Sequence, residues 1–129
     1  MITGVVTSSR EAIIHLSVSG PFGHEEVVEA VINTGFDGSL SLPPSLIAEL
    51  QLAWRGRGRA LLADGSESVF DIHEGIITVG WPPLWDGHPA HVAIDAVDMV
   101  PLIGMSLLES SELTVQVRPD GRVTIEALP

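Results

Sequence analysis

The chain has 129 residues and no cysteine, so it suits one domain (residues 1–129) that folds without disulfides or cysteine–zinc sites. Its 17 acidic and 6 basic residues give a formal charge of −11, which repels phosphate backbones and anionic lipid surfaces. We therefore expect neither nucleic acid nor a membrane as a partner. The first residues carry no basic, apolar leader pattern, which favours a cytoplasmic location.

Short apolar segments separated by Gly, Pro and Ser predict an all-β domain. The first three expected strands cover residues 4–7, 12–18 and 24–32. Within the second of them, Ile14, Leu16 and Val18 alternate with other residues. This period of two is typical of a half-buried strand.

A buried strand is expected to end at the triplet Asn33-Thr34-Gly35. Three apolar residues, Ala30-Val31-Ile32, precede the triplet, and a glycine-containing loop follows it. Leu40 and Leu42 then indicate a short strand. A short helix is predicted over residues 44–50, because proline is tolerated in a first helical turn and apolar residues recur there at helical spacing.

The dipeptide Asp64-Gly65 predicts a hairpin between residues 59–63 and 68–72. Asp-Gly is among the dipeptides that most favour a tight type I′ turn. Three arginines precede the turn at alternate positions and would share one face of a strand: Arg55, Arg57 and Arg59. A solvated outer face is the simpler interpretation of these arginines, and an anion-binding patch is the alternative.

The second half of the chain repeats the order strand, glycine, helix. The remaining expected elements are strands at 74–79 and 90–97, a Pro- and Trp-rich loop at 80–87, a helix at 105–110 and a hairpin of 113–117 and 123–127. Leu102-Ile103-Gly104 precedes the second helix much as Ile32-Asn33-Thr34-Gly35 precedes the first. This weak repeat indicates a duplicated unit in which one copy kept a polar residue before the glycine.

The apolar strand followed by Asn33-Thr34-Gly35 resembles the Asp-Thr-Gly active-site motif of aspartic proteases, with Asn33 in place of the catalytic aspartate. Phe36 and the turn Leu62-Ala63-Asp64-Gly65-Ser66 are similar to features of small bacterial retropepsin-like proteins. Together with Leu102-Ile103-Gly104 before a helix, the resemblance covers nearly the whole chain. It implies a retropepsin-like closed β-barrel, the acid-protease fold, with one or two short helices. It also implies aspartic endopeptidase activity without a metal or cofactor.

The resemblance assigns roles to the residues around the triplet. Asn33 matches the catalytic aspartate, and Thr34 matches the residue whose hydroxyl bonds to the other half-site. Gly35 matches the glycine that lets substrate backbone approach closely. Asp37 and Gly38 match residues that bind substrate backbone, although a loop-stabilising Asx turn is an equal alternative for them.

Two further segments receive roles from the same resemblance. The flap that folds over a bound peptide corresponds to four residues of the hairpin turn: Ala63, Asp64, Gly65 and Ser66. A brace beneath the catalytic loop corresponds to Leu102, Ile103 and Gly104, and plain core packing is nearly the same interpretation. The terminal strands, residues 1–7 and 123–127, are implied to build the sheet of a dimer.

Peptide hydrolysis by this route needs two adjacent carboxylates that share one proton. The chain offers one such position, so a complete site requires a symmetric homodimer acting on peptide or protein substrates. Asn33 is nearly isosteric with aspartate but does not ionise near neutral pH, so the chain as given is expected to be inactive. It is either an engineered Asp-to-Asn variant, which the intact Thr34, Gly35 and flap favour, or a natural pseudoprotease that serves as a peptide-binding or dimerisation module.

Other groups of residues suggest rival sites. Three histidines and two aspartates could indicate a metal site, and with it an acidic metal-binding β-domain: His73, His88, His91, Asp86 and Asp95. Their spacing matches no established ligand motif, so surface or core histidines are expected. The loop with Trp81 and Trp85 is either a partner-facing patch or, more simply, a cover for the edge of the core.

Overall fold

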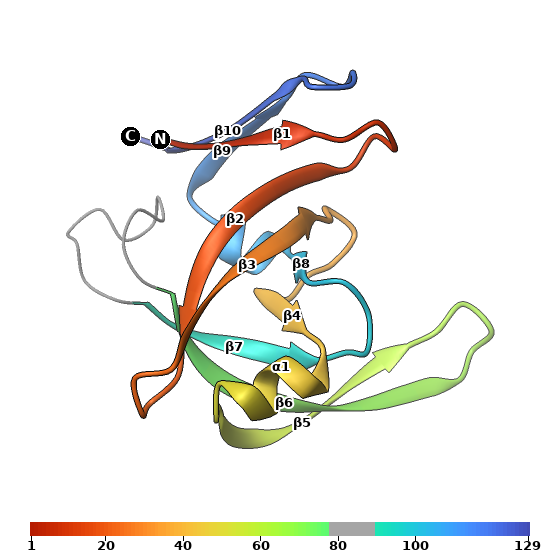
Figure 1. Cartoon of the computed structure of the whole chain (residues 1–129). Helices are drawn as coiled ribbons and strands as arrows, with labels where there is room; N and C mark the ends of the chain where they lie inside the picture. Colours follow the sequence, from red (N-terminus) through yellow and green to blue (C-terminus); the bar gives the residue numbers. More distant parts are fainter. Residues whose placement is uncertain (78–89) are drawn as a thin grey trace.

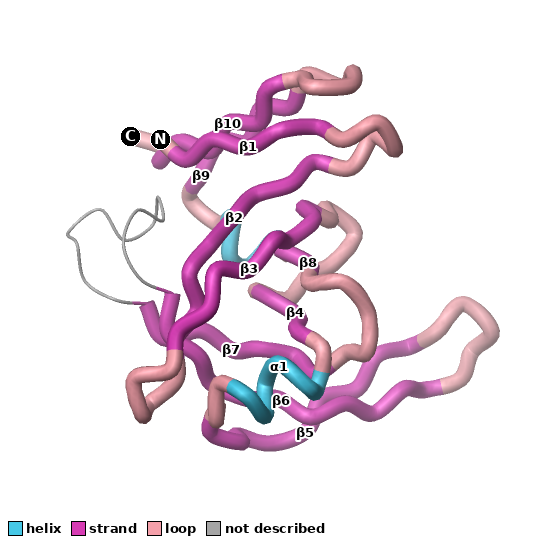
Figure 2. Tube along the Cα trace, viewed as in Figure 1, coloured by secondary structure: helices cyan, strands magenta, loops and turns pink. Residues whose placement is uncertain are grey.

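The computed structural model of the chain describes residues 1–77 and 90–129, and this part is mostly β-structure (Figures 1 and 2). The strands are β1 (Ile2–Val6), β2 (Ala12–Ser19), β3 (Glu25–Ile32), β4 (Leu40–Leu42), β5 (Ala53–Leu61), β6 (Glu67–Ile77), β7 (Ala90–Ala96), β8 (Leu102–Ile103), β9 (Ser111–Val115) and β10 (Arg122–Ala127). The helices in these ranges are α1 (Pro44–Glu49) and α2 (Met105–Leu108). The predicted all-β class with short helices is confirmed.

All described strands belong to one sheet, which closes on itself. The strand order is β5-β6-β7-β4-β8-β3-β2-β1-β10-β9, and β6 also pairs with β2. This additional pairing joins Val18 to Ile77 and completes a ring through β2, β3, β8, β4, β7 and β6. The ring is a small barrel, and β1, β10 and β9 extend from it at the top of Figure 1.

The interior of the barrel is apolar because alternate strand residues point inward. Ile14, Leu16 and Val18 of β2 are buried, as the alternation predicted. Helix α1 begins with proline in its first turn and buries Ile47 beside Leu50. These side chains belong to one contiguous core cluster that includes residues of both terminal strands.

The terminal strands lie inside the sheet. Strand β1 pairs with both β2 and β10, and β10 pairs with both β1 and β9. Neither terminal strand is therefore a free edge, although the resemblance implied that they build a dimer sheet. The free edge at this end of the sheet is β9.

The turn between β5 and β6 is not the predicted type I′ turn, which requires positive φ at both central residues. Only Gly65 has positive φ in this turn, at 85°. The Gly65 amide donates to the Leu62 carbonyl (3.0 Å), and the Leu62 amide donates to the Ser66 carbonyl (2.8 Å). The Asp64 carboxylate instead accepts hydrogen bonds from the amide and hydroxyl of Ser66, which hold Asp64 outside the left-handed region.

Several predicted boundaries differ from the structure. Helix α2 ends at Leu108 instead of Ser110, because the backbone of Glu109 leaves the helical conformation with ψ 140°. The predicted loop at 80–87 lies outside the described residues, and with it Trp81, Trp85, Asp86 and His88. Neither helix in the described ranges has the length and apolarity needed to cross a lipid bilayer.

Candidate functional site

The triplet Asn33-Thr34-Gly35 forms an exposed loop at the end of β3. The Asn33 side-chain oxygen accepts a hydrogen bond from the Gly35 amide at 2.9 Å, and the Asn33 carbonyl accepts one from the Phe36 amide at 3.1 Å. The Asx turn therefore occurs at Asn33 itself. This contact engages the side-chain oxygen of Asn33 within its own loop.

Strand β8 lies between β3 and β4, the two strands that flank this loop (Figure 1). The Asn33 amide donates to the Ile103 carbonyl at 2.9 Å. On the other side, the Gly104 amide donates to the Ser39 carbonyl at 2.9 Å, and the Met105 amide donates to the Phe36 carbonyl at 2.8 Å. Residues 103–105 thus hold both arms of the loop by main-chain hydrogen bonds.

Gly104 fits against the loop because it has no side chain. A Cβ atom on Gly104 would lie 2.1 Å from the Gly38 carbonyl oxygen and 2.6 Å from a ring carbon of Phe36. The neighbouring Ser106 adds two contacts: its hydroxyl donates to the Asp37 carbonyl (2.5 Å), and its amide donates to the Gly38 carbonyl (3.1 Å). Ser106 was not predicted as a loop-supporting residue, since a serine in a short helix has no distinguishing pattern.

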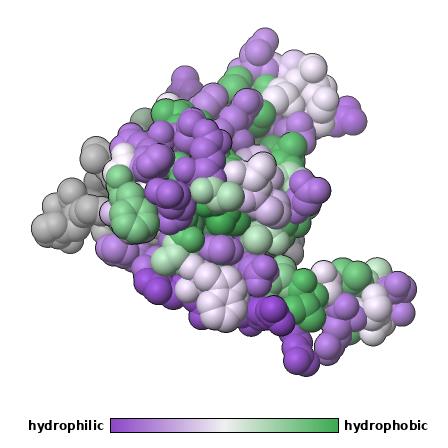
Figure 3. Space-filling view, turned by 60° about the horizontal axis from the view of Figure 1, so that its bottom comes forward, coloured by the Kyte–Doolittle hydropathy of each residue, from purple (hydrophilic) through white to green (hydrophobic). Residues whose placement is uncertain are grey.

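A cleft of about 750 Å³ lies between the Asn33 loop and the hairpin of β5 and β6. One wall contains Asn33, Gly35, Phe36 and Asp37. The hairpin contributes the opposite wall, from residues 59–62 and 68–70. Figure 3 shows this hairpin projecting from the body of the molecule, at the lower right.

The predicted flap residues lie at the end of this projection. Ala63, Asp64, Gly65 and Ser66 are exposed and lie beyond the residues that line the cleft. Hydrogen bonds from the side chain and then the amide of Ser66 lower the pKa of Asp64, which keeps this tip ionised. The residues next to the tip, and not the tip itself, face the Asn33 loop.

Asp95 of β7 is a second acidic residue of the cleft, and the sequence predicted a role for it only as a metal ligand. In the sheet it pairs with Ser41 of β4 and Ile72 of β6. Burial raises the pKa of Asp95, and the negative charge of Asp37 raises it further. Asp37 and Asp95 therefore face a common space, although they are far apart in the sequence.

The three arginines of β5 are exposed and paired across the strand with acidic residues of β6. The nitrogen–oxygen distances are 2.5 Å for Arg55–Glu74, 3.6 Å for Arg57–Asp71 and 3.6 Å for Arg59–Glu67. The carboxylates already occupy the positions that an anion would take. This pairing argues against the anion-binding patch. The three arginines do not form one regular outer face, because a β-bulge interrupts β5 between Trp54 and Gly56 and Arg59 also lines the cleft.

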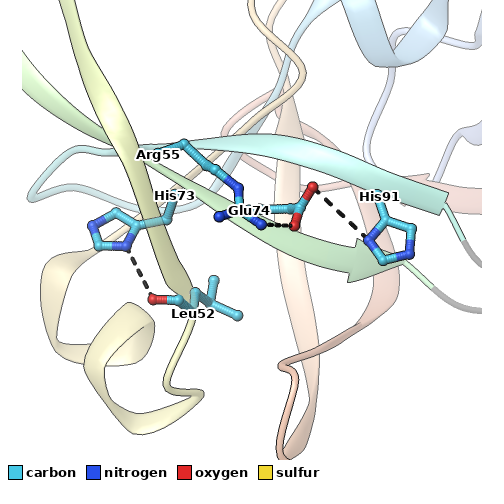
Figure 4. Close-up of polar contacts among 5 residues, drawn as sticks. All are labelled: Leu52, Arg55, His73, Glu74 and His91. Carbon is cyan, nitrogen blue, oxygen red and sulfur yellow. Dashed lines mark hydrogen bonds and ion pairs between the residues drawn. The ribbon is translucent and has the colours of Figure 1, made fainter.

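The described histidines do not gather around a common point. Figure 4 shows His73 and His91 facing in different directions from β6 and β7: His73 contacts the Leu52 carbonyl at 3.2 Å, and His91 lies 3.9 Å from Glu74. Within residues 1–77 and 90–129, no group of three or more His, Asp or Glu residues could hold a metal ion. The part of the predicted rival site that includes Asp86 and His88 lies outside these ranges.

The site therefore combines a braced loop, an adjoining cleft and a projecting hairpin. These parts suit the binding of an extended chain between loop and hairpin, and Asn33 supplies no ionisable group to the cleft. No family profile, no curated protein and no solved structure matches the chain. Any function must therefore be argued from the site itself.

Proposed function

We propose that the chain is a retropepsin-like aspartic peptidase domain that binds extended peptides as a homodimer and is catalytically silent because of Asn33. The observation that carries this proposal is the braced loop of Asn33-Thr34-Gly35 at one wall of a cleft of about 750 Å³ whose other wall is a projecting hairpin. A loop held on both sides keeps its polar side chain in one place, which acid–base chemistry requires.

The chemistry of the parent activity explains why Asn33 matters. In an aspartic peptidase, one carboxylate takes a proton from water while its protonated partner donates a hydrogen bond to the scissile carbonyl. The carboxamide of Asn33 accepts hydrogen bonds but takes up no proton at neutral pH. A dimer with Asn33 in both halves would bind peptide without hydrolysing it.

Exposure of the triplet supports the dimer. Asn33, Thr34 and Gly35 are exposed in the single chain, although their loop is rigidly held. A second copy related by a two-fold axis would cover them and bring two Asn33 side chains together. The free edge of β9 offers main-chain groups through which the sheet could continue into that copy.

Asn33→Asp tests the proposal directly. We expect this variant to hydrolyse extended peptides at mildly acidic pH at least about 100-fold faster than the chain with Asn33, because it restores the carboxyl pair. A peptide inhibitor that mimics the tetrahedral transition state should abolish this activity. Asn33→Ala is the matched control and should stay inactive.

The alternative is a peptide-binding or dimerisation module that has lost the remaining requirements of catalysis. The intact Asx turn at Asn33 is compatible with it, because asparagine maintains the loop. If Asn33→Asp folds, dimerises and binds peptide but hydrolyses none, the module is the better description. Hydrolysis by Asn33→Asp would favour an engineered variant of an active peptidase. Continued inactivity would favour a natural pseudoprotease.

A further inference from the structure

Three carboxylates line the cleft: Asp37, Asp95 and Asp98. The Asp95 carboxylate lies over the main chain next to Asp37, because its Oδ2 atom is 3.1 Å from the position that a Cβ on Gly38 would occupy. Glycine at position 38 leaves room for this carboxylate. Two acids that are far apart in the sequence, Asp37 of the loop and Asp95 of β7, thus face one part of the cleft.

Within residues 1–77 and 90–129, none of these three acids forms an ion pair. Ion pairs in the described part of the chain involve β5 arginines and His91, and each joins an acid of β6. Arg59 is the cation in the cleft lining, and it pairs with Glu67. The raised pKa of Asp95 has burial and Asp37 as its causes, with no neighbouring positive charge to offset them.

The rest of the lining is largely apolar. It includes Phe36, Leu61, Leu62, Val69, Phe70 and Leu102. Lysine and arginine bury an aliphatic stem along such a surface and place the charged head on a polar group beyond it. A cleft of about 750 Å³ has room for several peptide side chains.

We infer, on the basis of the proposed peptide-binding function, that the cleft selects peptides carrying a lysine or arginine side chain, with Asp95 and Asp37 binding its charged head. The apolar wall accommodates the stem. A bound cation also offsets the unfavourable proximity of the two carboxylates, which a neutral side chain cannot do. The net charge of −11 further attracts cationic peptides from solution.

Pools of fluorescent, end-capped peptides test this inference. The pools share flanks randomised among Ala, Val, Leu, Phe and Thr and differ only at the central residue, which is Lys, Met or Glu. Methionine matches the lysine stem without its charge. Fluorescence anisotropy should give the Lys pool at least about fivefold tighter binding than the Met pool, and the Glu pool the weakest.

Substitutions identify the residues responsible. Two variants each remove one of the carboxylates: Asp95→Asn and Asp37→Asn. Each should remove most of the preference for Lys over Met. Asp120→Asn is the matched control, because Asp120 is exposed in the β9–β10 connection and its positive φ of 62° suits asparagine. This variant loses the same charge and should keep the preference.

The outcomes separate the inference from the function on which it rests. Equal binding of the Lys and Met pools, or a preference that survives both cleft substitutions, overturns the charge selection and leaves peptide binding standing. If no pool binds the chain at all, the peptide-binding function fails, and the inference fails with it.

Discussion

Asp95 carries a negative charge where its surroundings disfavour it. Burial and then the charge of Asp37 raise its pKa above the ordinary value of 3.8. The folded state therefore holds this proton more tightly than the unfolded chain does. Below the unfolded pKa the side chain is neutral in both states, and as pH rises through the folded pKa its ionisation lowers the free energy of unfolding.

The direction of this pH dependence predicts how removal of the Asp95 charge changes the stability. Asp95→Asn should raise the Tm by a few degrees at about pH 7 and leave it nearly unchanged at about pH 2.5. Thermal unfolding followed by circular dichroism at both pH values measures the difference, with Asp120→Asn as the control. A gain of the same size at both pH values would mean that charge is not its cause.

Gly104 is the second residue on which the site depends. A Cβ there would lie 2.1 Å from the Gly38 carbonyl oxygen, so Gly104→Ala must displace the loop or β8. We expect this substitution to lower the free energy of unfolding by about 3 kcal/mol in urea titrations. Gly23→Ala is the control, because Gly23 has φ 86° but no atom within 4 Å of its Cβ position.

Alanine at position 23 should lower the free energy of unfolding by only about 1 kcal/mol, because its side chain disfavours this positive φ. Equal losses for the two variants would argue against a close fit of Gly104 beneath the loop. A larger loss for Gly104→Ala, with reduced peptide binding in the folded fraction, would connect the brace to the site.

At the scale of elements, the β5–β6 hairpin is the part of the site with the most exposed apolar surface. Leu61 is 77% exposed and Val69 is 57% exposed, yet both line the cleft. Apolar side chains that bury so little of their surface on folding are available for contact with a ligand. The double substitution Leu61→Ser and Val69→Ser should therefore weaken peptide binding by about fivefold or more, with little change in Tm.

Val117→Ser is the matched control for the hairpin. Val117 is 70% exposed and lies in the connection between β9 and β10, away from the cleft lining. Anisotropy titrations with the same peptide pools should show unchanged affinity for this variant. An equal loss in both proteins would indicate a general effect of surface apolarity instead of a contact in the cleft.

Elements with a clear period could be predicted from the sequence, and those defined by long-range pairing could not. The alternation in β2 and the proline-initiated helix α1 are local patterns, and both were placed within about two residues. Strand β8 has only two residues, so no period marks it. Its position between β3 and β4, and the closure of the ring at Val18 and Ile77, depend on distant strands.

The same distinction applies to the site. The motif at Asn33 is contiguous, so sequence could single it out. Asp95 reaches the cleft only because β7 pairs in parallel with β4, and a lone aspartate in a strand carries no sign of that. The hairpin was predicted, but its turn type was wrong because the bonds between Asp64 and Ser66 override the usual preference of Asp-Gly.

At the scale of the whole molecule, the proposed dimer requires a surface for the second copy. Along β9 and β10, the Gln116 amide bonds to the Arg122 carbonyl, and the Leu128 amide bonds to the Ser110 carbonyl. Hydrogen-bonded pairs alternate along an antiparallel ladder, so the main-chain groups of Leu113 point to the open edge. Another β9 could pair there.

We therefore expect sedimentation to detect a concentration-dependent species of twice the 13.7 kDa chain mass. Leu113→Pro removes the outward amide and should weaken dimerisation by about tenfold or more. Leu113→Ala loses the side chain but keeps the amide, and should dimerise more strongly than the proline variant. Added salt should favour the dimer, because each chain carries a charge of −11.

A monomer at all concentrations and salt levels would contradict the dimer and any activity of Asn33→Asp that depends on it. A dimer that Leu113→Pro leaves intact would instead place the contact on another surface. Circular dichroism of both variants shows whether the barrel is retained.

The position of β8 also bears on how the protein is made. The strands on either side of the Asn33 loop are synthesised well before the segment that joins them, residues 102–106. A nascent chain therefore has no finished loop until this segment has been made.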